Sequence, residues 1–259
     1  MFTLADFKTI FWLEYLHRLL GRLMGLVFFV PGALFWIRGW LTPQLKRRFV
    51  GMLLLGASQG LMGWYMVKSG LVDMPHVSPY RLAAHLFLAL ILYSWILWTA
   101  LSLSCPKKST DSFVRSMFLW LLVPLTLTIF YGALVAGLKA GLIYNTFPLM
   151  NSALVPEDAW AMAPWYKNLF ENPAMVQFIH RWLACGTAAV IFGACIYAKQ
   201  KAGHNRPLTR ALTATQGAIL VQVGLGIATL LTHVPTTLAT LHQLGAVGVL
   251  TGLVWVLKK

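Results

Sequence analysis

Long, continuously apolar stretches dominate this sequence. A helix that crosses a bilayer needs about 20 apolar residues. Seven stretches approach or exceed that length: residues 14–37, 49–67, 82–101, 117–138, 174–198, 211–232 and 236–257. Within each stretch the apolar positions are continuous and do not alternate with polar ones, which excludes the pattern of a membrane β-barrel. The pattern therefore predicts an all-α membrane protein with seven transmembrane helices.

Composition supports this class. Of the 259 residues, 58% are hydrophobic and 11% are charged, whereas an ordinary soluble domain carries roughly 25% charged residues. The net charge of +14 would suggest nucleic-acid binding in a soluble protein. Here the basic residues lie in short runs between apolar stretches, as membrane topology requires. We therefore expect no nucleic-acid partner and a chain surrounded by a lipid bilayer.

The basic runs also predict orientation. Lys and Arg gather in residues 38–48, 107–115 and 199–210 and at the C-terminal end, and the loops between these runs have few. The positive-inside rule places such runs on the cytoplasmic or matrix side, with the N-terminus outside and the C-terminus inside. Residues 1–11 contain Asp6 and Lys8 and no small-residue cleavage site, so we expect no cleavable signal peptide.

An internal repeat predicts two related halves. Residues 14–18 (EYLHR) match 177–181 (QFIHR), residues 59–63 match 222–226, and residues 81–86 match 238–243. Such repeats indicate two pseudo-symmetric halves. The stretch 117–138 precedes the second copy but has no counterpart before the first, so we expect a four-plus-four bundle whose first helix is missing from this chain.

This repeat defines a domain prediction. The predicted parts are an N-terminal half of three helices (1–101), an inner connecting loop (102–116), and a C-terminal half of four helices (117–259) with a long outer loop (139–173). The outer loop is rich in aromatic residues and prolines, so it could form a lid over the outer ends of the helices. An aromatic belt at the membrane interface is the simpler alternative.

Four histidines carry the candidate chemistry. His17, His85, His180 and His242 each lie within the first turns of a predicted helix, at its outer end and at matching places in the repeat. Paired imidazoles from facing helices ligate haem iron axially. The pattern predicts two such pairs, one in each half. For any single histidine, a role as an interfacial polar residue remains the alternative.

The two halves differ at one acidic position. Glu14 precedes His17 by three residues and Arg18 by four, so the three side chains share a helix face. In the second copy Gln177 replaces the carboxylate, and an amide cannot exchange a proton in the same way. The first half is therefore the candidate for catalysis and the second for a fixed cofactor. The alternative is that Glu14 simply pairs with Arg18.

Three arginines lie beside these histidines. Arg18 and Arg181 directly follow His17 and His180, and Arg81 precedes His85 by about one turn. Guanidinium groups at this depth suit haem propionates, which they bind in bidentate fashion. Snorkelling to lipid head groups is the alternative for each arginine.

Glu14-Tyr15-Leu16-His17-Arg18 forms an ExxHR motif, and this motif resembles that of the haem A synthase family, in particular its proteobacterial and mitochondrial branch. Further similarity lies in Ser69-Gly70-Leu71, in Val77-Ser78-Pro79-Tyr80-Arg81-Leu82 with His85, and in the continuous stretch 136–150 (AGLKAGLIYNTFPLM). The resemblance covers essentially the whole chain.

The resemblance implies an eight-helix inner-membrane protein that oxidises a methyl group of haem O to a formyl group by successive hydroxylations. In that family pattern His17 and His85 hold the substrate haem O, with Glu14 as the essential acid. His180 and His242 ligate a resident haem b. Haem O synthase and cytochrome c oxidase assembly are the implied partners, and a homo-oligomer is left open. The implied location is the bacterial inner membrane, or the mitochondrial inner membrane in a eukaryote.

The chain departs from the family in two places. The family's first transmembrane helix has no counterpart here, and residues 1–8 resemble the loop that follows it. The outer-loop cysteine pair of some relatives is also absent.

Two other function classes remain as rivals. One is a di-haem b-type electron-transfer protein, which Glu14 distinguishes from a synthase. The other is a repeat-built transporter, which is disfavoured because the four histidines lie toward one face.

Overall fold

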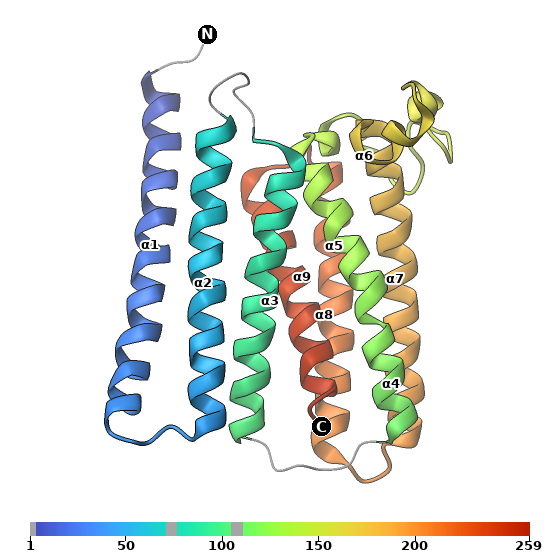
Figure 1. Cartoon of the computed structure of the whole chain (residues 1–259). Coiled ribbons are helices and arrows are strands. Elements are labelled where there is room, and N and C mark those ends of the chain that lie inside the picture. The colour runs from blue at the N-terminus through green and yellow to red at the C-terminus, as the bar shows by residue number, and fades with distance from the viewer. Residues whose placement is uncertain (1–3, 71–76, 105–110) are drawn as a thin grey trace. The chain divides into compact units, whose positions relative to one another are not determined.

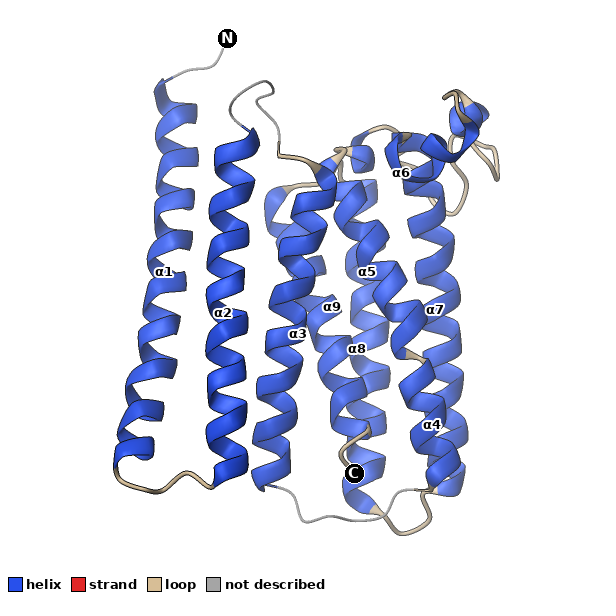
Figure 2. Cartoon of the chain, viewed as in Figure 1, coloured by secondary structure: helices blue, strands red, loops and turns tan. Residues whose placement is uncertain are grey.

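The computed structural model describes residues 4–70, 77–104 and 111–259, and these ranges consist of helices and connecting loops without any strand (Figure 2). Leu71 of one family-like motif and the inner-loop residues Lys107 and Lys108 fall outside the described ranges. Among the described residues, seven helical segments are long and apolar enough to cross a membrane. The predicted all-α membrane fold is therefore confirmed.

The membrane-crossing helices have well-defined bounds. They are α1 (Leu4–Ile37), α2 (Pro43–Gly70), α3 (Pro79–Ser104), α4 (Ser112–Trp120) continued by α5 (Leu122–Gly137), α7 (Pro173–Lys201), α8 (Arg206–Leu231) and α9 (Thr236–Val256). The outer loop between α5 and α7 contains η1 (Ala140–Leu142), η2 (Glu157–Trp160), η3 (Trp165–Lys167) and α6 (Asn168–Glu171).

Local signals explain where several helices begin. The Asn172 side chain accepts hydrogen bonds from the backbone N–H groups of Ala174 and Met175, which caps α7. Asn205 caps α8 and Asp111 caps α4 in the same manner. A side-chain oxygen at this position satisfies backbone donors that have no partner within the helix.

The helices extend beyond several of the predicted apolar stretches, and two of these differences are informative. Helix α1 begins at Leu4 and not at residue 14, so the polar residues that interrupt the apolar pattern there are still helical. The stretch predicted as 117–138 begins at Ser112 and breaks at Leu121 into α4 and α5. Pro124 explains the break, because its ring lacks an N–H and clashes with the carbonyl of the residue four positions earlier.

The chain divides into two compact units, Met1–Tyr65 and Met66–Lys259. The first contains α1 and most of α2, joined by a turn in which Gly39 has a φ of +73°. The rings of Phe28 and Trp36 lie against Phe49, with ring centres 5.4 and 6.3 Å from it. The division at 102–116 that the repeat predicts stays a prediction.

In the Met66–Lys259 unit the helices pack side by side (Figure 1). Helix α3 packs against α5 and α9, α5 packs against α7, α7 against α8, and α8 against α9. The outer loop and α6 lie at the end of this unit where α7 begins. Helix α3, which belongs to the first copy of the repeat, therefore contacts helices of the second copy.

The apolar core of this unit lies toward the end opposite the outer loop. Its largest fully buried side chains include Phe118, Ile191, Leu212 and Leu253. Within α9 the buried residues all lie between Val249 and Val256. The half of α9 that carries His242 is therefore not part of this core.

Candidate functional site

His180 and His242 lie face to face in the Met66–Lys259 unit. His180 is in the third turn of α7 and His242 in the second turn of α9. Their ring centres are 6.5 Å apart and their planes are inclined by 79°. Both side chains are partly buried. The structure thus brings together the two histidines that the sequence assigns to the second half.

This spacing suits one metal ion between the rings. A metal–imidazole bond is about 2 Å long, so two imidazoles on opposite sides of one metal place their ring centres roughly 6 Å apart. The 6.5 Å separation agrees with that arrangement. No group of three or more His, Cys, Asp or Glu side chains suited to a metal occurs in the described part of the chain. The two imidazoles are a candidate donor set, of the kind that ligates a haem axially.

A backbone hydrogen bond selects the tautomer of His180. Its Nδ1 lies 3.1 Å from the carbonyl oxygen of Thr128 on α5. Because a carbonyl oxygen only accepts, Nδ1 must carry the proton, and Nε2 keeps its lone pair. A ligand histidine usually makes such a bond through its other nitrogen.

Hydroxyl groups reinforce this part of α5. The Thr128 hydroxyl lies 2.8 Å from the carbonyl of Pro124 and 2.9 Å from the hydroxyl of Thr187 on α7. Thr187 is buried. These bonds tie α5 to α7 beside the helix break, so the carbonyl that receives His180 is held by both helices.

Arg181 anchors the outer loop. Its Nη1 donates to the carbonyls of Thr146, Pro148 and Leu149 at 2.8, 3.2 and 3.0 Å. Its Nη2 donates to the carbonyl of Tyr144 at 3.3 Å. The side chain is only 7% exposed, and its Nε has no hydrogen-bond partner. The guanidinium thus donates hydrogen bonds to four loop carbonyls, and it belongs to the residue that follows His180.

Gln177 occupies the place that Glu14 has in the first copy of the repeat. It is 3% exposed, and its Nε2 donates to the Tyr144 carbonyl at 3.0 Å. Its buried Oε1 has no hydrogen-bond partner. In the second half, this amide therefore supports the outer loop together with Arg181.

Buried asparagines complete the loop's framework. Asn168 is fully buried and bonds to the backbone of Met162 and Trp165. Asn145 donates to the carbonyls of Gly141 and of Leu230 in α8, at 2.8 and 2.9 Å. The outer loop is thus a built structure joined to α7 and α8. Whether it acts as a lid stays a prediction.

Tyr144 makes a short hydrogen bond within this loop. Its hydroxyl donates to Asp158 Oδ1 at 2.5 Å. This bond, with smaller contributions from burial and from the charges of Asp158 and Glu157, raises the pKa of Tyr144 to about 12. A phenolate there would lose the bond and face a carboxylate, so the neutral form is favoured.

The first-half residues are divided between the two units of the chain. Glu14 and Arg18 on α1 form an ion pair, which is the alternative role for Glu14, and His17 beside them is exposed. In the other unit, Arg81 and His85 on α3 are both partly buried. Pairing offsets two of the charges on α1, which lowers the cost of their membrane location.

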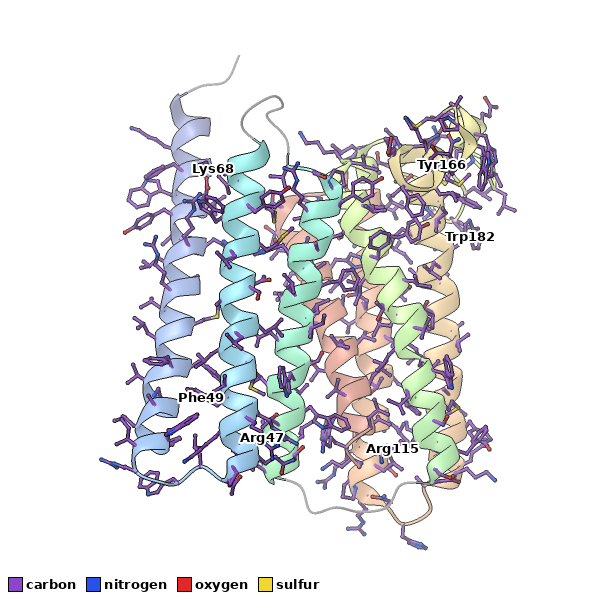
Figure 3. The ribbon with its side chains drawn as sticks, viewed as in Figure 1. Arg47, Phe49, Lys68, Arg115, Tyr166 and Trp182 are labelled. Atoms are coloured by element: carbon purple, nitrogen blue, oxygen red, sulfur yellow. The ribbon has the colours of Figure 1, made fainter. Side chains whose placement is uncertain are left out.

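Aromatic and basic residues occupy opposite ends of the Met66–Lys259 unit. Figure 3 shows Tyr166 and Trp182 at the end that carries the outer loop, and Arg115 at the other end. Trp160, Trp165 and Tyr166 in the loop are largely exposed. This distribution is typical of a membrane protein with aromatic residues at an interface. Cys185 and Cys195, both on α7, are free thiols.

The sequence matches one family of known proteins. Residues 1–254 match the model of the COX15-CtaA family, described as cytochrome oxidase assembly protein. The chain belongs to this family. Together with the seven spans, the match makes the chain a multi-pass membrane protein.

Individual relatives are similar over almost the whole chain. Heme A synthase COX15 of Homo sapiens is 44% identical over 268 residues, which is 99% of this chain and 65% of the relative. Heme A synthase of Paramagnetospirillum magneticum is 46% identical over 98% of this chain and 73% of the relative. That of Nitrosomonas eutropha is 45% identical, with 99% and 74% covered. The chain thus spans about two thirds of the human relative's length.

Sequence reasoning missed several contributors to the site. The Thr128 carbonyl has no signal in the sequence, because any residue supplies a backbone acceptor. The loop-anchoring role of Arg181 depends on a fold of residues 144–149 that hydropathy does not encode. Asn172 could have been found, because Asn followed by Pro before an apolar stretch is a helix-start signal.

Proposed function

We propose that this chain is a haem A synthase, which oxidises a methyl group of haem O to a formyl group by successive hydroxylations. The observation that carries the proposal is the pair of imidazoles, His180 and His242, with ring centres 6.5 Å apart in a chain whose relatives are named Heme A synthase. We propose haem b as the group held between these two rings.

The residues at this pair fit a haem. The half of α9 that carries His242 has no side chain buried by the protein itself, so a flat macrocycle can contribute to its packing. A Cβ added at Gly132 or Gly226 would lie within about 3 Å of a histidine ring. Any other residue at these positions would therefore displace the ring. When bound, such a group supplies one-electron transfer.

The protein's own groups have separate roles in this proposal. His180 keeps its proton on Nδ1 through the Thr128 carbonyl, and its Nε2 remains available for iron. Arg181 orders the outer loop beside the pair, and its Nε has no hydrogen-bond partner and is available to a propionate. We therefore assign Arg181 mainly to loop order and only secondarily to propionate binding.

We further propose that His17 and His85 hold the substrate haem O, with Arg18 and Arg81 toward its propionates. This assignment rests on the repeat and the family motifs. Glu14 is the proposed acid that exchanges protons near the reacting methyl group. In the structure its carboxylate forms an ion pair with Arg18, four residues later on α1.

The proposed setting follows from the family and the charge pattern. We propose a bacterial plasma membrane or a mitochondrial inner membrane, with the basic loops inside and the outer loop outside. Haem O synthase and the cytochrome c oxidase assembly machinery are the proposed partners, and a homo-oligomer is left to experiment. The halves 1–101 and 117–259 are the proposed substrate and haem b bundles, joined by 102–116.

Glu14→Gln tests the proposal. In membranes supplied with haem O, we expect the variant to lose more than about 90% of haem A formation, because acid–base groups contribute typically 100-fold or more to rate. The haem b spectrum should be unchanged. Pigment extraction and chromatography measure haem A, and difference spectra measure haem b. Glu157→Gln, an exposed change in the outer loop, is the matched control.

The same experiment tests the rival function. In a di-haem b electron-transfer protein, Glu14 would only neutralise Arg18, as the observed ion pair allows. Wild-type protein would then yield two haem b per chain and no haem A, and Glu14→Gln would change neither result. That outcome would replace the proposed function with the rival.

A further inference from the structure

The rings of His180 and His242 contact glycines in the same way. A Cβ at Gly132 on α5 would lie 3.0 Å from Cε1 of His180, and a Cβ at Gly226 on α8 would lie 2.8 Å from Cε1 of His242. In both cases Cε1 is the nearest atom, followed by Nδ1 and then Nε2. Each ring therefore meets its glycine by the same edge.

A backbone carbonyl stands four residues before each glycine. The Thr128 carbonyl accepts the His180 Nδ1–H at 3.1 Å. The Gln222 carbonyl lies at the matching position before Gly226, beside the His242 ring. Nδ1 of His242 is buried and makes no hydrogen bond of ordinary geometry. Residues four apart share one face of a helix, so each ring lies on a surface formed by a carbonyl and the glycine one turn later.

The glycines of these helices differ in what surrounds them. Gly224 lies on the same helix as Gly226, two residues away, yet a Cβ there would meet no atom within 4 Å. Gly217 on α8 and Gly186 on α7 are equally open. At Gly137, Gly245 and Gly252 a Cβ would meet Pro79, Gln222 and Thr215, as in ordinary helix packing. At Gly132 and Gly226 the nearest atoms belong instead to the two histidine rings.

We propose that Gly132 and Gly226 are positioning residues that hold the two imidazoles in the orientation required to ligate one iron porphyrin. The inference rests on the proposed function. Each glycine allows its ring to lie against the neighbouring helix, so that the distance between the rings matches one metal. Neither glycine touches the reacting atoms.

The expected effect on the ligands is much larger than the effect on the fold. A methyl group at either position meets the end of a histidine side chain, which can rotate away at small cost to folding. A ligand pair must be held within about 0.5 Å of its working geometry. The added methyl group therefore moves a ligand without unfolding the protein. The contact at 226 is shorter, so Gly226→Ala should be the more severe change.

The test compares Gly226→Ala, Gly132→Ala and the matched control Gly224→Ala in the full chain. Each protein is purified in detergent, titrated with haem b, and examined by absorption and electron paramagnetic resonance, which report low-spin, two-histidine ligation. We expect Gly226→Ala to bind haem b at least about tenfold more weakly, as for other residues that orient a ligand, with a high-spin contribution. Gly132→Ala should change in the same direction but less, and Gly224→Ala should equal wild type.

Thermal unfolding of the haem-free proteins separates positioning from structure. We expect all three variants to melt within a few degrees of wild type. A low-spin spectrum and haem affinity equal to wild type in Gly226→Ala would overturn the inference while leaving the proposed function intact. An equal loss in Gly224→Ala, or a large loss of haem-free stability, would also overturn it. Failure of wild type to bind haem, or full binding by His180→Ala and His242→Ala, would reject the proposed function itself.

Discussion

At the residue scale, the start of α7 shows how one sequence motif can serve two purposes. Glu14 and Gln177 occupy matching places in the repeat, as do Arg18 and Arg181. On α1 the acid and the arginine pair with each other. On α7 the amide and the arginine are buried and bind the outer loop's carbonyls. Replacing a carboxylate by an amide removes the partner for Arg181, so its donors become available to the loop.

Asp158→Asn should lower the pKa of Tyr144. The hydrogen bond to Asp158 is the main cause of the raised value of about 12, and the substitution also removes a negative charge close to the phenol. We expect the pKa to move toward the ordinary value of about 10. Alkaline difference absorbance of the phenolate band, wild type minus variant, measures the shift. A pKa unchanged by the substitution would contradict the observed bond.

The sign of the linkage follows from the raised value. Because the folded protein binds the Tyr144 proton more tightly than the unfolded chain does, the bond contributes stability below about pH 10. That contribution is lost as the pH rises toward about 12. In wild type, protease should therefore cleave the outer loop faster as the pH rises through this range. In Asp158→Asn the cleavage rate should depend less on pH. Tyr166→Phe, in the same loop, is the control.

At the element scale, the break between α4 and α5 lies on the span that receives the His180 ring. Leu121 interrupts the regular helix two turns before Thr128 and three turns before Gly132, the two residues that contact this ring. Hydropathy predicts one continuous span because all the residues concerned are apolar. Pro124 is the visible signal for the break, and proline inside a membrane helix removes one backbone hydrogen bond.

We expect Pro124→Ala to make the helix continuous across Leu121. The new N–H at residue 124 can donate to the carbonyl of Trp120, and one added hydrogen bond is worth about 1 kcal/mol. We expect amide exchange over residues 120–125 to slow by roughly fivefold, measured by hydrogen–deuterium exchange with mass spectrometry. In Pro207→Ala, in the first turn of α8 where the N–H needs no helical partner, exchange should stay the same. Unchanged exchange in Pro124→Ala would show that another residue causes the break.

At the scale of the whole molecule, the two ends of the Met66–Lys259 unit differ in polarity. The apolar core lies toward the end with Arg115, and the histidine pair lies toward the end with the outer loop. The connection between α7 and α8, which carries basic residues, and the aromatic outer loop lie at opposite ends of this unit. The predicted orientation would place the histidine pair near the outer surface.

Thiol labelling tests that orientation. In a cysteine-free variant expressed in a bacterial inner membrane, Ala161→Cys in the outer loop should react with a membrane-impermeant maleimide in intact cells whose outer membrane has been permeabilised. Ser112→Cys at the start of α4 should react only after the inner membrane is opened. Both positions are exposed. Labelling in the reverse order would invert the proposed topology.

Much of the fold could be predicted from the sequence, because a bilayer requires each spanning backbone to satisfy its own hydrogen bonds. A continuous apolar stretch of about 20 residues therefore has one stable conformation in lipid. All seven spans follow from this rule. The repeat also identifies His180 and His242 as members of one pair before any helix is placed.

The surroundings of that pair were decided by tertiary structure alone. Three features depend on how the helices rotate and pack. They are the backbone carbonyl that accepts the His180 proton, the glycines that contact the two rings, and the loop carbonyls that surround Arg181. Hydropathy is nearly uniform around these helices, so it does not encode their rotation. The sequence by itself thus determined the number of helices and the residue types of the site, and side-chain packing between distant segments determined its geometry.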